Sequence, residues 1–150
     1  ETFEFPKEKS FGFKGFINCK VRALLLYVLH HSKDFKKELS VNKIWNGPSD
    51  IGSRIQEDYI NMMLRNSISL CPRGIGIDSV RLLETCYYTR VRVCNANLTP
   101  DNLKEELIKI NEIPLDELED RAHLARKYFD TVIREYFKDP TQYFLNWLDI

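Results

Sequence analysis

A glycine-containing turn carries the residues of this chain best suited to bind an anion. The segment from Ser69 to Glu84 reads SLCPRGIGIDSVRLLE, a short apolar stretch followed by a turn and an amphipathic stretch. Arg73 and Arg81 flank the turn, Gly74 lies within it, and Ser79 lies at the expected start of a helix. Backbone N–H groups and the positive end of a helix point at whatever lies above such a turn. The expected ligand is therefore an anion.

A carboxylate one helical turn beyond Arg81 extends this interpretation. Glu84 is suited to sugar hydroxyls, because a carboxylate accepts the hydrogen bonds that hydroxyls donate. The segment therefore predicts a nucleotide or nucleotide-sugar site. The structural alternative is an ordinary helix pair between Arg81 and Glu84, which contributes only about 0.3–0.5 kcal/mol. No Lys-Ser/Thr pair follows the turn, so the pattern excludes a P-loop.

The composition is typical of a single globular domain that spans residues 1–150. Of its residues 43% are apolar and 29% charged, and 22 basic residues balance 22 acidic ones. A net charge of zero gives no support to a nucleic-acid or membrane-surface binder. No apolar run approaches the roughly 20 residues that span a bilayer, so we expect no transmembrane segment. The four cysteines lack the spacing of a zinc site, and we expect no metal.

Hydrophobic periodicity predicts strands and helices in alternation. The predicted strands cover 10–18, 41–45, 68–71 and 91–94. The predicted helices cover 20–35, the stretch that begins at Ser49 or Asp50, and the stretch that begins at Asp78 or Ser79. This alternation favours a parallel sheet covered by helices, with ligands at the carboxyl ends of the strands. The glycine turn follows the strand at 68–71 at such an end.

The last third of the chain predicts helices only. Thr99-Pro100 is typical of a helix start, and an apolar stripe runs from Leu115 to Tyr136, with Asp139-Pro140 ending that helix. A short aromatic-rich helix follows over 142–148. We expect aromatic side chains to dock these helices onto the sheet or onto a partner domain. The predicted fold class is a three-layer Rossmann-like α/β domain with extra C-terminal helices.

The central stretch resembles the exostosin-like glycosyltransferases. Cys71-Pro72-Arg73-Gly74 matches the family's Cys-Pro-Arg-Gly-like turn, and Ser79-Val80-Arg81-Leu82-Leu83-Glu84 matches its Ser-x-Arg-x-x-Glu helix. Phe11 to Phe16 looks like the family's opening strand, and Val21-Arg22 looks like the pair that opens its first helix. The resemblance extends over most of the chain, from Phe11 to Leu148.

The resemblance implies the C-terminal, donor-binding half of a two-domain glycosyltransferase of the GT-B type. It implies a UDP-sugar donor, a glycan acceptor, and an acceptor-binding N-terminal domain or partner chain. By position, the donor-site residues carry over to Arg22, Arg73, Gly74, Ser79, Arg81 and Glu84. The arginines would orient the diphosphate, and Glu84 would hold ribose hydroxyls. No cofactor is implied, because arginines and helix dipoles can stabilise a leaving diphosphate where other glycosyltransferases use a metal.

The chain departs from the family pattern after the helix that bears Glu84. Thr89 stands where the family has Gly, and Arg92 where it has Pro. A segment on the order of 25 residues, enough for one strand of about 5–6 residues and a loop, lacks a counterpart after about residue 94. The residue pattern identifies no general base for transfer.

Two alternatives to a transferase follow. The first is a non-catalytic α/β nucleotide-binding or interaction module that has lost transferase activity. The second is a phosphate-binding enzyme unrelated to sugars. The resemblance leads us to expect a cytoplasmic protein, or one of the Golgi lumen if the chain is part of a membrane-anchored eukaryotic enzyme.

Overall fold

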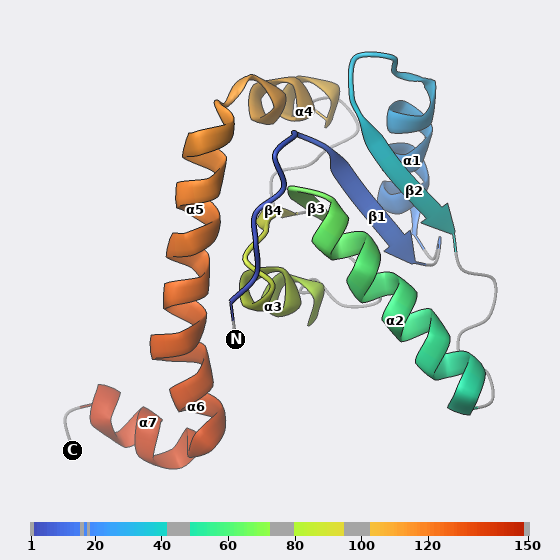
Figure 1. The fold of residues 1–150 in the computed structure, drawn as a ribbon. Helices are drawn as coiled ribbons and strands as arrows, with labels where there is room; N and C mark the ends of the chain where they lie inside the picture. The colour runs from blue at the N-terminus through green and yellow to red at the C-terminus, as the bar shows by residue number, and fades with distance from the viewer. Residues whose placement is uncertain are drawn as a thin grey trace.

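Parallel strands form the small sheet of this α/β fold (Figure 1). The computed structural model describes residues 2–15, 17, 19–41, 49–72, 80–94 and 103–148. Within these residues the sheet has four strands in the order β2-β1-β3-β4, all parallel. They are β1 (Phe11–Gly15), β2 (Lys37–Val41), β3 (Ile68–Cys71) and β4 (Val91–Cys94). The predicted α/β class with a parallel sheet is confirmed.

A helix lies between each strand and the next one along the chain. These helices are α1 (Lys20–His31), α2 (Ser49–Arg65) and α3 (Val80–Tyr87). Parallel strands require such crossovers, because a tight turn returns the chain in the antiparallel direction. The second strand lies earlier than the predicted 41–45, over Lys37–Val41, and residues 42–48 lie outside the described part of the chain. Its half-exposed residues at the sheet edge give only a weak alternating pattern.

Helices α1 and α2 pack against opposite sides of β1. Successive strand residues point to opposite faces of a sheet, so neighbouring residues of β1 face different helices. A Cβ added at Gly12 would lie 2.8 Å from Met62 Sδ and 2.9 Å from Asn66 Cβ, so Gly12 faces α2. Phe13 faces α1, where the guanidinium of Arg22 lies 5.8 Å from its ring centroid. Figure 1 shows α2 running alongside β1, with α1 behind β2.

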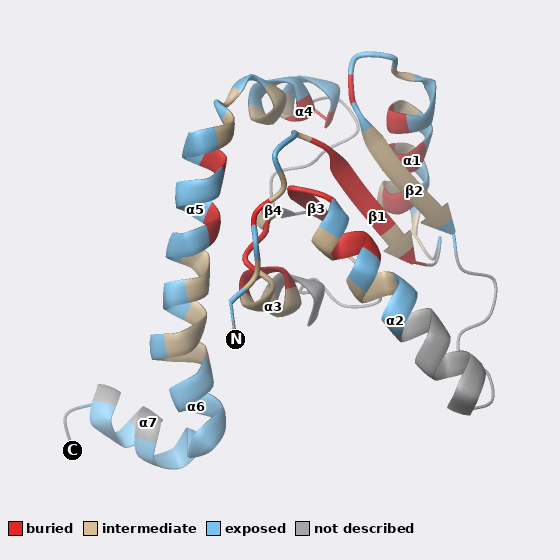
Figure 2. Ribbon diagram, viewed as in Figure 1, coloured by how far each residue is buried: buried red, intermediate tan, exposed pale blue. Residues whose placement is uncertain are grey.

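The apolar core lies on the α1 side of the sheet. Strand residues Phe11 and Phe13 pack there with residues of α1. Figure 2 shows buried residues in red along β1 and β3. Two C-terminal helices complete it, α4 (Leu103–Glu112) and α5 (Leu115–Tyr128), through Leu103, Leu107, Leu118 and Ala122. Burying a side chain of this size contributes about 1.5–3 kcal/mol. These contacts hold α5 along the edge of the sheet beside β4.

The long C-terminal helix of the sequence prediction is interrupted. After α5, a π-helical turn, η2 (Phe129–Ile133), leads into α6 (Arg134–Lys138) and then α7 (Pro140–Trp147). The predicted break at Asp139-Pro140 is confirmed. Of the aromatic residues predicted to dock these helices, Phe129 packs against Tyr87 of α3, with ring centroids 5.4 Å apart.

Two other aromatic residues of this region are largely exposed to solvent. Tyr136 and Phe137 are exposed to 40% and 65%. The side chains of Tyr143, Phe144 and Trp147 lie outside the described part of the structure. None of the helices in the described ranges is both long enough and apolar enough to cross a membrane.

Helix α3 ends in a left-handed residue. The Arg90 N–H donates to the Thr85 carbonyl at 3.0 Å, and the Thr89 N–H donates to the Cys86 carbonyl at 3.2 Å. This pattern is a Schellman cap, which places the residue after the helix in the left-handed region. Thr89 takes this place with a φ of 57°. A β-branched residue is rare there, and Thr89 is the position at which the exostosin-like pattern has Gly.

Candidate functional site

The carboxyl end of β3 meets the beginning of α1. Cys71 and Pro72 are buried at this end, and the Nη2 atom of Arg22 lies 3.5 Å from the Pro72 carbonyl oxygen. Arg22 is only 8% exposed, and its guanidinium lies over the Phe13 ring. A guanidinium keeps its charge when buried. The first turn of α1 contains no acidic residue, so the positive end of this helix adds to that charge.

The six predicted donor-site residues are only partly within the described structure. Arg22 and Glu84 are described with their side chains. Arg81 is described only as a member of α3, without its side chain. Arg73, Gly74 and Ser79 lie outside the described residues, as does most of the glycine turn. The described part of the candidate site therefore consists of Arg22, the end of β3 and Glu84.

Glu84 is bound to a neighbouring helix. The Tyr59 hydroxyl of α2 donates to Glu84 Oε2 at 2.6 Å, and both side chains are partly buried. Helix α3 packs on the side of β3 toward which Cys71 points, because Cys71 Sγ lies 3.3 Å from Thr85 Oγ1. This is the α2 side of the sheet. Arg22 and Glu84 therefore lie on opposite sides of the sheet, and the structure does not bring them into direct contact.

Tyr59 was not singled out as a candidate site residue from the sequence. Tyr59 belongs to the apolar stripe of α2, and this position is typical of an ordinary core residue. A signal was nevertheless present, because a tyrosine in a packed stripe needs a partner for its hydroxyl. Identifying Glu84 as that partner requires the three-dimensional arrangement, since the two residues are 25 positions apart.

A second buried arginine lies at the amino end of β4. Arg90 is 1% exposed, and burial lowers the pKa of its guanidinium to about 10, so it stays protonated at neutral pH. A guanidinium has five N–H donors. Those of Arg90 contact five main-chain carbonyls, at distances of 2.7–3.2 Å, on Glu4, Met63, Leu64, Tyr88 and Thr89. These carbonyls come from the N-terminal segment, the end of α2 and the α3–β4 turn.

The cavity beside Arg90 is therefore a poor candidate site. It measures about 520 Å³ and lies between the N-terminal segment, Leu64, Arg65 and Arg90. Because every donor of Arg90 already contacts a carbonyl, its guanidinium joins chain segments and has no donor left for an anion. Arg90, the buried cation that lines this cavity, therefore has a structural role.

Comparisons with known proteins do not assign the site. No family model, no curated protein and no solved structure matches the chain. Over the described ranges, no three His, Cys, Asp or Glu side chains come together in a way that could hold a metal ion. What the geometry offers is a buried positive charge at a strand end, an arrangement suited to a phosphate-bearing ligand.

Proposed function

We propose that this chain binds the diphosphate and ribose of a UDP-sugar at the carboxyl edge of its sheet, as the donor-binding half of an exostosin-type glycosyltransferase. The observation that carries the proposal is the position of Arg22. This residue follows β1, its guanidinium reaches the end of β3 at Pro72, and the arginine-flanked glycine turn begins at the next residue.

The order of the strands supports this location. The chain passes from β1 to β2 in one direction along the sheet and from β3 to β4 in the other. Such a reversal opens a crevice between β1 and β3, and open α/β sheets bind ligands at this point, outside the carboxyl ends of the strands. Arg22 and Pro72 lie near this point of reversal. The same strand order is expected of a Rossmann-like domain of the three-layer type, which we take to be the fold of the complete donor half.

The charges of this edge suit a leaving group. In sugar transfer from UDP, the bond between the anomeric carbon and the diphosphate oxygen breaks, and negative charge grows on the diphosphate. Arg22 and the N-terminal end of α1 stabilise that charge as it develops. Arg73 and Arg81 contribute in the same way.

Glu84 is proposed to recognise the ribose. Tyr59 holds one oxygen of this carboxylate, Oε2, at 2.6 Å. A fixed carboxylate accepts a hydrogen bond from a ribose hydroxyl at low entropic cost. The separation of Arg22 and Glu84 across the sheet fits a ligand whose diphosphate and ribose are separate groups. A general base for the acceptor is proposed to come from the acceptor-binding half or partner chain.

Calorimetric titration with UDP, UMP and uridine tests the proposal. We expect the affinity to fall in that order, because each step removes negative charge from the ligand. Glu84→Gln should weaken UDP binding by about 1–3 kcal/mol, the scale of a hydrogen bond to a charged group. Glu119→Gln, an equal charge change on exposed α5, is the matched control and should bind UDP like the wild type. A folded wild-type chain that does not bind UDP would contradict the proposal.

A further inference from the structure

A separate cavity of about 330 Å³ lies at the other end of the strands. Thr89, at the amino end of β4, forms one wall, and Thr2 and Phe3 of the N-terminal segment form another. The third wall comes from α5, η2 and α6, through His123, Arg126, Asp130 and Arg134. The cavity is thus built from three distant parts of the chain and lies away from the carboxyl edge that holds Arg22.

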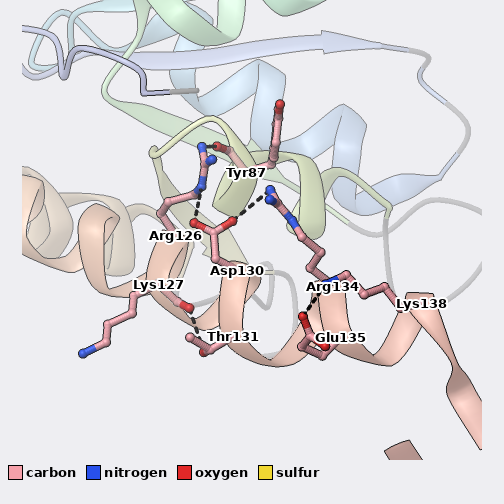
Figure 3. Close-up of polar contacts among 8 residues, drawn as sticks. All are labelled: Tyr87, Arg126, Lys127, Asp130, Thr131, Arg134, Glu135 and Lys138. Carbon is pink, nitrogen blue, oxygen red and sulfur yellow. Dashed lines mark hydrogen bonds and ion pairs between the residues drawn. The ribbon is translucent and has the colours of Figure 1, made fainter. Parts of the chain in front are cut away.

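Two arginines enclose one carboxylate in the third wall (Figure 3). Arg126 Nε donates to Asp130 Oδ2 at 2.9 Å, and Arg134 Nη2 lies 2.9 Å from Asp130 Oδ1. Arg126 is also fixed from the other side, because its Nη1 donates to the Tyr87 carbonyl at 2.6 Å and its guanidinium lies 4.7 Å from the Tyr87 ring centroid. Two guanidinium groups against one carboxylate leave a net positive charge on this wall.

The carboxylate is incompletely satisfied. Within the described residues, Asp130 Oδ1 is buried and has no hydrogen bond, since the nearby Arg134 provides charge without an aligned N–H. An acceptor that is paired by charge alone keeps part of the cost of its lost hydration. Such atoms are rare in native proteins, and an unfilled ligand position is one reason for them. A group that donates an O–H would satisfy Oδ1.

Two backbone irregularities meet at the same cavity. Thr89 has a φ of 57°, and the helix carries its π-helical turn where it bears Asp130. Strained residues and π-helical turns both collect at functional sites. Here the two distortions determine where Thr89 and Asp130 lie in the walls of the cavity. The two come from unrelated segments and are therefore independent observations.

We propose that this cavity binds a phosphate monoester that carries a hydroxyl group. The phosphate oxygens accept hydrogen bonds from Arg134 and from the hydroxyls of Thr2 and Thr89, and the ligand hydroxyl donates to Asp130 Oδ1. Arginine is well suited to phosphate, because its planar fork of donors matches the oxygens. The aspartate weakens the binding of a phosphate ester that lacks such a hydroxyl, because only a hydroxyl donor offsets the repulsion between its charge and the phosphate.

Titration with glycerol phosphate and methyl phosphate, followed by NMR shifts of the Thr89 and Asp130 amides, tests this site. We expect glycerol phosphate to bind about tenfold more tightly than methyl phosphate, the scale of one hydrogen bond to a charged group. Arg134→Gln should weaken both by about tenfold or more. Asp130→Asn should tighten methyl phosphate binding and reduce the preference for glycerol phosphate, because it removes the negative charge.

Two controls separate binding in this cavity from a general effect of surface charge and from binding at the UDP site. Arg121→Gln removes an exposed arginine of α5 that pairs with Glu117 in the same i,i+4 manner, and it should leave binding unchanged. Arg22→Gln should also leave the shifts at Thr89 and Asp130 unchanged, which distinguishes the cavity from the UDP site. Equal weakening by Arg121→Gln and Arg134→Gln, or the absence of ligand-induced shifts at Thr89 and Asp130, would overturn the proposal.

Discussion

Two arginines are buried at opposite ends of the sheet, and their surroundings differ. Arg90, at the amino end of β4, directs all five N–H groups at main-chain carbonyls of its own chain. Arg22, at the carboxyl end, lies over Phe13 and approaches the Pro72 carbonyl at 3.5 Å, near the point where the strand order reverses between β1 and β3. Burial alone does not mark a binding arginine. What distinguishes the two is that every donor of Arg90 contacts a main-chain carbonyl at the amino end of the sheet, whereas Arg22 lies at the carboxyl end, where α/β sheets bind ligands.

The sharpest test of this difference is the removal of Arg90. Arg90→Met should lower the free energy of unfolding by about 3–5 kcal/mol, because the carbonyls that it satisfies remain buried without a charged donor. Urea denaturation followed by circular dichroism measures this loss. Arg65→Gln breaks an exposed pair with Glu38 and should cost less than about 1 kcal/mol. A similar small loss in both variants would mean that Arg90 is not a structural clamp.

A smaller effect of opposite sign is expected at the neighbouring residue. Thr89→Gly should raise the free energy of unfolding by up to about 1 kcal/mol, because it relieves a left-handed β-branched residue. The larger entropy that glycine loses on folding offsets part of this gain. Thr89→Ala is the control, because it removes the same hydroxyl but retains the Cβ and its strain. Equal stability of the glycine and alanine variants would show that Thr89 carries no such strain. Both variants should bind glycerol phosphate less tightly, which links the strained residue to the cavity.

The sequence predicts the buried strand β3 better than the half-exposed edge strand β2. Strand β3 lies where the apolar pattern at 68–71 places it, because a buried parallel strand leaves a strong signal, and β4 covers the predicted 91–94. The edge strand β2 is half-exposed, and the sequence pattern predicts it a few residues too late. The π-helical turn at Phe129–Ile133 was not predicted, since the apolar stripe continues through it without a breaking residue.

The candidate sites depend on contacts that no local pattern reveals. Glu84 follows from the residue pattern and Arg22 from the resemblance, and the structure adds Tyr59 and the strand end at Pro72. Arg90 looks like one more charged residue of a basic stretch, yet it contacts Glu4, 86 positions away. Arg126 and the carbonyl of Tyr87 are 39 positions apart. Unless its long-range contacts are known, a charged residue of this kind cannot be assigned to a structural clamp, to a cavity wall or to the surface.

The most direct test of the UDP site is a calorimetric titration of UDP into three folded proteins: the wild type, Arg22→Gln and Arg65→Gln. The two variants lose the same charge, one at the carboxyl end of the sheet and one on the exposed end of α2. We predict that Arg22→Gln weakens UDP binding by about tenfold or more, the loss of a charge-assisted hydrogen bond, and that Arg65→Gln binds like the wild type. Equal affinity in all three proteins would contradict a diphosphate site at Arg22.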